Sequence, residues 1–202
     1  MKTIKTVLLK IWKHKYWFLS PVVIPVILIP ILQSKQYINK IIAVELIKIT
    51  DGDTLEVTDT NKKIYNVRLY GIDTPETQKD FKDEILAKDE NFYAQLAKKY
   101  LINLLNNQTL SLQILQKDKY NRFVGVIYLN DLQINNSINN LLVKNGWARV
   151  YYIQDQNPKK MYFINSQWSK NFYQMLLNSQ EYAKDNLLGF WKENYNHIFH
   201  KT

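Results

Sequence analysis

One arginine and two carboxylates lie close together between Arg68 and Glu76, and their side chains suit phosphate and cation chemistry. Residues 64–72 are rich in β-branched and aromatic side chains, which predicts a strand, and Pro75 prevents further pairing because it lacks an N–H. Asp73 and Glu76 are therefore expected in a turn at a strand end. A guanidinium fork binds phosphate oxygens, whereas carboxylates bind cations or accept a proton from water.

The predicted turn offers the oxygen ligands that a hard divalent cation prefers. The Asp73 carboxylate and the backbone carbonyl of Thr74 are suited to calcium, which leaves Glu76 to act on water. In a regular strand the five-residue spacing puts Arg68 and Asp73 on opposite faces, so their convergence requires a twist or a bulge. The alternative is a surface turn beside a solvated arginine, because turns favour Asp and Pro for conformational reasons.

Polar motifs at two other predicted strand ends are candidate partners of this turn. Asp51-Gly52-Asp53-Thr54 connects the apolar run 41–49 to residues 55–58, and Asp118-Lys119-Tyr120-Asn121-Arg122 connects 110–116 to 123–129. Each motif taken alone is typical of a hairpin turn, which is the alternative to a functional role. Asp53 is the candidate ligand of the first motif, because carboxylates at two strand ends can share one cation.

The order of these motifs resembles the thermonuclease family, also called staphylococcal-nuclease-like. The resemblance extends from about Val44 to Trp191 and includes two further motifs, Asn145-Gly146-Trp147-Ala148-Arg149-Val150 and Leu187-Leu188-Gly189-Phe190-Trp191. It implies a calcium ion held by two carboxylates and one backbone carbonyl, those of Asp53, Asp73 and Thr74. It also implies two arginines that grip the scissile phosphate and a glutamate that activates water, namely Arg68, Arg122 and Glu76.

The second arginine motif departs from the family pattern at one position. The family has Tyr-Gly-Arg, whereas this chain has Tyr120, Asn121 and Arg122. Asn adopts the left-handed backbone conformation more readily than most residues, so we expect the turn to keep its shape. Bases stack on aromatic rings, and the corresponding segments of the family approach the nucleotide. We therefore predict substrate contacts for Lys119, Tyr120 and Tyr152.

The pattern of elements predicts an α+β fold, a five-stranded OB-fold-type β-barrel with flanking helices. Apolar residues at helical spacing predict a core-facing helix, at Phe92, Leu96, Tyr100 and Leu104. We expect a shorter helix over 137–145, ended by Gly146, and a long closing helix over 161–188. Residues 78–91 are highly charged without apolar periodicity and predict a mobile loop beside Glu76.

The first 40 residues differ in composition from the rest of the chain. They hold seven of the 27 basic side chains and no acidic one, so most of the net charge of +9 belongs to them. The uncharged segment 16–32 follows a basic segment, 1–15, and predicts a transmembrane anchor whose N-terminus is cytoplasmic and whose domain lies outside. A tether over 33–40 would lead to a thermonuclease-like domain over 41–195.

Two other interpretations of segment 16–32 stay open. It is also compatible with a cleaved signal segment, which would make the protein secreted, and with a buried or interfacial segment. Three prolines weaken a regular helix there, although membrane helices tolerate proline better than soluble ones do. The chain has no cysteine, which excludes disulfides and thiolate metal sites.

The favoured function is a membrane-anchored, calcium-dependent phosphodiesterase that hydrolyses DNA and RNA with low sequence specificity. We expect a monomer that needs no protein partner. The main alternative is a non-catalytic nucleic-acid-binding OB-fold module. Such a module would not need a combination of five residues, namely Arg68, Glu76, Asp53, Asp73 and Arg122. A tethered scaffold whose carboxylates only cap turns is a third interpretation.

Overall fold

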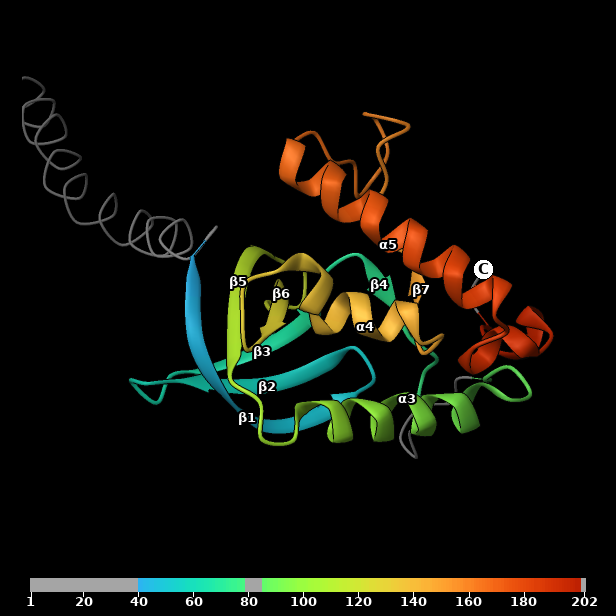
Figure 1. Ribbon diagram of the computed structural model, residues 1–202, viewed down its shortest axis with the longest axis horizontal. Helices are drawn as coiled ribbons and strands as arrows, with labels where there is room; N and C mark the ends of the chain where they lie inside the picture. Colours follow the sequence, from blue (N-terminus) through green and yellow to red (C-terminus); the bar gives the residue numbers. More distant parts are fainter. Residues whose placement is uncertain (1–39, 79–84, 201–202) are drawn as a thin grey trace, which may run out of the picture. The chain divides into compact units, whose positions relative to one another are not determined.

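Five strands close into a barrel. The computed structural model describes residues 40–78 and 85–200, whose elements are drawn in Figure 1. The strands neighbour one another in the order β1-β2-β3-β6-β5. Their bounds are β1 Ile41–Asp51, β2 Thr54–Asp59, β3 Ile64–Leu69, β5 Leu110–Lys117 and β6 Phe123–Leu129. The predicted α+β fold with a five-stranded OB-type barrel is confirmed.

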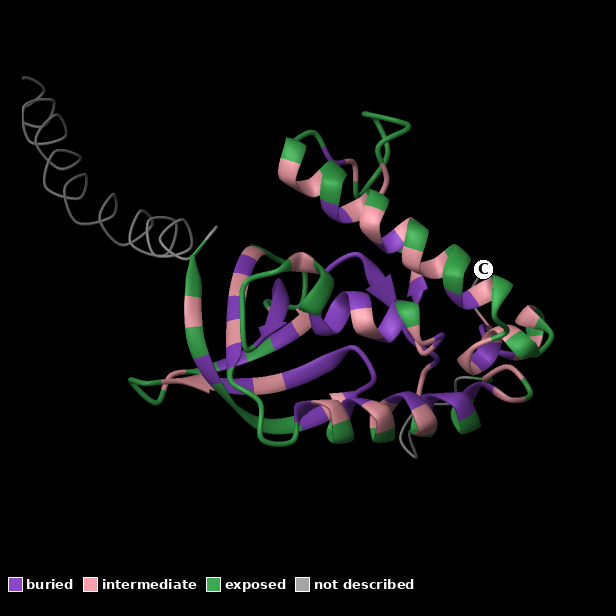
Figure 2. Cartoon of the chain, viewed as in Figure 1, coloured by how far each residue is buried: buried purple, intermediate pink, exposed green. Residues whose placement is uncertain are grey.

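The barrel interior is formed by the apolar side of each strand. Along β5, Leu110, Leu112 and Ile114 are buried and alternate with partly exposed residues, as expected for a strand with one face in a core. Strand β6 is buried along its whole length, since helix α4 packs against it from outside. Figure 2 shows buried residues on β2 and β3 as well, where along β3 they alternate with more exposed ones.

In the part of the chain that the structure describes, three α-helices flank the barrel. Helix α3, Glu90–Leu105, packs on β1, while α4, Ile138–Lys144, lies between β6 and the long helix α5, Gln167–Asp185. Ser137 and Ser166 accept backbone N–H bonds at the starts of α4 and α5, which satisfies donors that have no partner within a helix. Short 3₁₀ turns complete the elements: η1 Ile134–Asn136, η2 Gly189–Lys192 and η3 Tyr195–His197.

A second, two-stranded sheet forms beside the barrel. Its strands are β4, Ile72–Asp73, and β7, Arg149–Val150, which pair antiparallel. The chain reaches β4 from β3 through Gly71, whose φ of +76° is a conformation that side-chain-bearing residues rarely adopt. This turn between β3 and β4 breaks the regular strand alternation between Arg68 and Asp73.

A second apolar cluster joins the C-terminal residues to helix α3. It contains Tyr93, Phe190, Ile198 and Phe199, and Trp147, Trp191 and Tyr195 are among the half-buried side chains that pack against it. The rings of Phe190 and Phe199 meet edge to face at 5.3 Å between centroids, a favourable aromatic geometry. The cluster therefore fixes the C-terminal residues against the start of α3.

The predicted helices exist, but two details of them were wrong. Phe92 is 61% exposed, and the buried residues of α3 lie one position later, at Tyr93, Ala94, Ala97, Leu101 and Leu105. Small alanines let α3 approach the barrel closely, and a search for large apolar residues misses them. Helix α5 begins at Gln167, not at residue 161, because Ser166 caps it. The Gly146 ending of α4 is confirmed by a φ of +72°.

Several predicted segments lie outside the described residues. These are the basic segment 1–15, the anchor 16–32, all of the tether except Lys40, and residues 79–84 of the charged loop. Within 40–78 and 85–200, no helix combines the length and the apolar character needed to cross a bilayer. The membrane anchor stays a prediction.

Candidate active site

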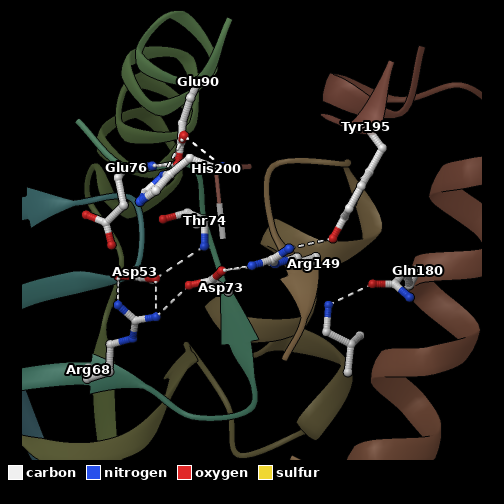
Figure 3. Close-up of polar contacts among 11 residues, drawn as sticks. Asp53, Arg68, Asp73, Thr74, Glu76, Glu90, Arg149, Gln180, Tyr195 and His200 are labelled. Carbon is white, nitrogen blue, oxygen red and sulfur yellow. Dashed lines mark hydrogen bonds and ion pairs between the residues drawn. The ribbon is translucent and has the colours of Figure 1, made fainter. Parts of the chain in front are cut away.

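A guanidinium group lies between two buried carboxylates where β2 begins and β3 ends. Arg68 binds Asp53 with both arms of its fork, Nη1 lying 2.9 Å from Oδ1 and Nη2 lying 2.9 Å from Oδ2. Nη2 also donates to Oδ1 of Asp73 at 2.9 Å. Figure 3 shows the three side chains meeting. The structure thus brings together three residues that the sequence assigns to one site.

Strand register explains this meeting of distant residues. Thr54 pairs with Arg68 across β2 and β3, and the backbone N–H of Leu69 donates to the carbonyl of Asp53 at 2.9 Å, so Asp53 lies beside the end of β3. The turn through Gly71 then returns Asp73 to the same place. Residues on paired strands are neighbours regardless of their separation in sequence.

The turn that follows β4 is tied to the hairpin between β1 and β2. The backbone N–H of Thr74 donates to Oδ2 of Asp53 at 3.2 Å, and the Thr77 hydroxyl donates to Oδ1 of Asp51. A Cβ on Gly52 would lie 2.9 Å from Oγ1 of Thr74, so the close approach of the two segments requires glycine. The Asp-Gly-Asp-Thr hairpin is therefore also a support for the turn.

Glu76 extends from this turn toward the side of the site where Asp53 lies, as Figure 3 shows. Its backbone N–H donates to Oε1 of Glu90 at 3.3 Å. Burial lowers the pKa of Arg68, but the charges of Asp53 and Asp73, then those of Tyr152 and Glu76, raise it above its ordinary value. Glu76 is thus close enough to act electrostatically on the guanidinium group.

A buried arginine that the sequence reasoning left without a role binds the same aspartate. Arg149 is 3% exposed, and its Nε and Nη2 lie 3.0 and 2.8 Å from Oδ2 of Asp73. Its guanidinium carbon lies 3.9 Å from the centroid of the Phe199 ring, and Nη1 donates to the Tyr195 hydroxyl. Register again explains the contact, since Asp73 and Arg149 pair across β4 and β7.

Burial and like charges shape the electrostatics of the site. Burial raises the pKa of Asp53, the nearby charge of Asp73 adds to the increase, and Arg68 opposes it. The buried carboxylates of Asp53 and Asp73 repel each other, so a positive charge between them is stabilising. Arg68 supplies such a charge in the structure, and a bound cation would supply another.

The donor set of the site fits a hard cation. Asp53 and Asp73 provide carboxylate oxygens, and Thr74 provides a backbone carbonyl, all chemically suited to calcium or magnesium. Within the part of the chain that the structure describes, no group of three or more His, Cys, Asp and Glu side chains is placed to hold a metal. The predicted set of two carboxylates and one carbonyl does not require such a group.

The turn between β5 and β6 holds three other predicted residues together. Arg122 donates to Oδ2 of Asp118 at 2.7 Å, and the guanidinium of Arg122 and the ammonium of Lys119 both lie over the Tyr120 ring. In residues 40–78 and 85–200 no hydrogen bond or ion pair joins Arg122 to the Arg68 cluster. Asn121 has a φ of +64°, as expected for the replacement of glycine.

Parallel pairing nevertheless brings this turn toward β3. Strand β6 runs parallel to β3, and Val124 lies opposite Arg68. Arg122 therefore lies directly before β6, two residues ahead of the partner of Arg68. Its role at the phosphate stays a prediction, as do those of Lys119 and Tyr120, whose ring is 68% exposed.

Tyr152 lies directly beside the cluster. Its ring is 5.3 Å from the guanidinium carbon of Arg68 and meets the Tyr162 ring edge to face at 5.1 Å. Burial and the charge of Asp73 raise the pKa of Tyr152 to about 12, so the phenol is neutral at physiological pH. A half-exposed neutral ring next to Arg68 is a suitable surface for a stacked base.

Comparison with known proteins identifies the family. Residues 66–193 match the model of the family described as staphylococcal nuclease homologue. The chain belongs to the staphylococcal nuclease family. The resemblance stated from the motifs is therefore confirmed, and the chain is a nuclease. The matched residues include Arg68, Asp73, Glu76 and Arg122, whereas Asp53 precedes them.

Several curated proteins are similar to this nuclease. They include an uncharacterized protein of Methanocaldococcus jannaschii, MJ1439, which is 29% identical over 73% of this chain and 70% of its own length. Endonuclease YncB of Bacillus subtilis is 31% identical over 77% of this chain and 64% of its own length. An uncharacterized endonuclease of Escherichia coli is 28% identical over 56% of this chain and 63% of its own length. The chain thus spans less than two thirds of the last two relatives.

Proposed function

We propose that this nuclease is a calcium-dependent phosphodiesterase that hydrolyses DNA and RNA with low sequence specificity. The observation that carries the proposal is the Arg68 fork held between Asp53 and Asp73, beside Glu76. A guanidinium group, two hard-cation ligands and a further carboxylate are the groups needed to cleave a phosphodiester. The names of similar proteins as endonucleases support cleavage within a strand.

Each group would have a different role in the same hydrolytic step. Hydrolysis adds negative charge to the phosphoryl oxygens, and Arg68, fixed by two carboxylates, meets that charge without reorganising. Glu76 would accept the proton of the attacking water. A cation held by Asp53, Asp73 and the Thr74 carbonyl would supply charge neutralisation when bound. Arg122 would be the second arginine, after exchanging Asp118 for a phosphate oxygen.

Substrate contacts are proposed around two aromatic side chains. Tyr152 would stack on a base next to the scissile phosphate, while Tyr120 and Lys119 would contact the strand farther along. Stacking recognises every base, because each has a π-face, and the 2′-hydroxyl is not needed for it. Low sequence specificity and activity on both DNA and RNA follow from this mode of binding.

The cellular setting is also a proposal. Segment 16–32 would anchor the chain in a membrane, with the nuclease domain outside, where calcium is plentiful; secretion after cleavage is the alternative. We expect a monomer without a protein partner. A non-catalytic binding module is the competing function, but a binder has no use for an Arg68 fork, two cation-binding aspartates and a water-activating carboxylate at one place.

The proposal is tested with the full chain and end-labelled single-stranded DNA and RNA. Calcium, magnesium or a chelator is supplied in separate reactions. We expect both substrates to be cut in calcium and neither to be cut with chelator. Tight binding of intact DNA without cleavage in any metal would support the binding module instead. Equal activity in magnesium would keep the nuclease and contradict calcium selectivity.

A further inference from the structure

The end of the described chain contacts the turn that carries Glu76 through one buried carboxylate. Glu90, 1% exposed at the start of α3, accepts the backbone N–H of Glu76 at 3.3 Å and that of Ala87 at 2.9 Å. Its Oε2 also accepts the backbone N–H of His200 at 3.0 Å, and Nδ1 of the His200 ring lies 2.7 Å from Oε2 and 2.9 Å from Oε1. Figure 3 shows the Glu90 carboxylate meeting both His200 and the backbone of Glu76.

The same C-terminal segment, defined as residues 195–200, also contacts the other side of the site. The Tyr195 hydroxyl accepts a hydrogen bond from Arg149, and the Phe199 ring lies against the guanidinium of Arg149. Arg149 in turn binds Asp73. The segment therefore reaches Asp73 through Arg149 and Glu76 through Glu90.

The segment is held firmly enough to position its neighbours. Ile198 is fully buried and Phe199 is 3% exposed in the cluster with Tyr93 and Phe190. The backbone N–H of Asp89 donates to the carbonyl of His197 at 2.8 Å, which joins the segment to the residue before α3. Packed side chains and backbone bonds thus fix His200 relative to Glu90.

We propose that His200 and Glu90 are positioning residues for Glu76, so that the C-terminal segment sets the orientation of the water-activating turn. A donor at Nδ1 of His200 lies against both carboxylate oxygens of Glu90, and this holds the carboxylate in the orientation in which Oε1 accepts the backbone N–H of Glu76. Without that donor the backbone N–H groups of Ala87 and His200 still hold Oε2, whereas Oε1 loses the ring nitrogen. The bond from Oε1 to the Glu76 N–H then weakens and the turn loosens. The inference rests on the proposed function for its catalytic consequence, whereas its structural consequence is independent of it.

Variants of the full chain separate this role from general stabilisation. His200→Ala removes the donor, and His200→Asn restores one, because Nδ2 of Asn occupies a place similar to that of Nδ1. His197→Ala is the matched control, since the ring of His197 is half exposed, lies 3.5 Å from Asp89 and does not contact Glu90. If His200→Ala fails to fold, the variant His200→Phe is used in its place, because it keeps a packed ring and lacks the donor.

Two quantities are measured. The first is kcat and KM for cleavage of single-stranded DNA at saturating calcium. The second is the hydrogen-exchange rate of the Glu76 amide, followed by NMR without metal. We expect His200→Ala to lower kcat about tenfold with KM unchanged, as for residues that orient catalytic groups, and to speed exchange at Glu76. His200→Asn should return both values toward wild type, and His197→Ala should change neither.

Normal kcat and normal Glu76 exchange in His200→Ala would overturn the inference while leaving the proposed function in place. A loss in His200→Ala that His200→Asn does not restore, or that His197→Ala shares, would also overturn it, because the role would then be structural. If the wild-type chain cuts no nucleic acid, the proposed function fails, and the exchange rates of the three variants alone decide the positioning role.

Discussion

Asp73 is the residue on which the two arginines of the site converge. Its Oδ1 accepts from Arg68 at 2.9 Å and its Oδ2 from Arg149 at 3.0 Å, so both oxygens have a charged donor. Such charge-assisted bonds fix the plane of a carboxylate as well as its charge. The direction of Asp73, which would decide how it meets a cation, is therefore set by a residue outside the motifs that carry the chemistry.

Replacing Arg149 by Met should harm both stability and metal binding. Asp73 would keep its burial and lose one partner, and breaking a buried ion pair costs about 3 kcal/mol. Urea unfolding of the full chain measures the first effect. Calorimetric titration with calcium measures the second, which we expect to be a weakening of at least about tenfold. Unchanged calcium affinity would show that Arg68 alone orients Asp73.

Asp118 predicts a pH effect of known sign. Burial alone would raise its pKa, but hydrogen bonds from the side chain and backbone of Arg122 lower it below the ordinary 3.8. A carboxyl whose pKa is lower in the folded state stabilises the fold above pH 3.8, and this contribution is lost as the pH falls through the folded pKa.

The check on this effect is the difference in melting temperature between wild type and Asp118→Asn, followed from pH 6 to pH 2. Wild type should be the more stable protein above the ordinary pKa of 3.8, and the difference should shrink as the pH falls below it. If the difference in melting temperature grew as the pH fell, the stabilising ion pair between Asp118 and Arg122 would be contradicted.

At the scale of elements, the site is assembled where three short connections meet. The hairpin between β1 and β2 contributes Asp53, and the turn after β4 contributes the backbone N–H of Thr74. The turn through Gly71 brings Asp73 of β4 back to Arg68. Rigid barrel strands fix the ends of these connections. A small change in the backbone path of any one connection would therefore separate groups that must act together.

Gly52→Ala tests the fit between two of these connections. The new Cβ would lie 2.9 Å from Oγ1 of Thr74 and 3.1 Å from Cβ of Ala97, so either the turn or helix α3 must move. We expect a melting temperature lower by several degrees and a higher calcium concentration for half-maximal activity. Thr74→Ala removes the nearest atom and keeps the carbonyl, so the double variant should recover part of the lost stability.

The elements show clearly what a sequence can predict here. The five barrel strands and the Asn121 turn follow from alternation and turn chemistry, which are local, and both are present. The role of Arg149 was missed because it depends on the pairing of β4 with β7, a long-range contact between two-residue strands. Its signal was a lone arginine in an apolar run, the same pattern that drew attention to Arg68.

At the scale of the whole domain, residues 195–200 complete the part of the fold that the structure describes. Ile198 and Phe199 enter the cluster with Tyr93, and His200 reaches Glu90 across 110 positions of sequence. Residues 195–200 have no periodic pattern that predicts packing. The sequence alone therefore placed the end of the domain at residue 195 and did not predict the contacts of the residues that follow. The predicted anchor at 16–32 would tether this domain from its other end.

The central claim is that Arg68, held by Asp53 and Asp73, stabilises the charge that develops on a phosphate during hydrolysis. The most direct measurement is kcat of Arg68→Ala on single-stranded DNA at saturating calcium, beside Arg68→Lys, which keeps the charge and loses the fork. Loss of one preorganised donor of this kind costs about 3 kcal/mol, so we predict a kcat at least about 100-fold below wild type for Arg68→Ala. Turnover within a few-fold of wild type, in a folded Arg68→Ala protein, would contradict the account.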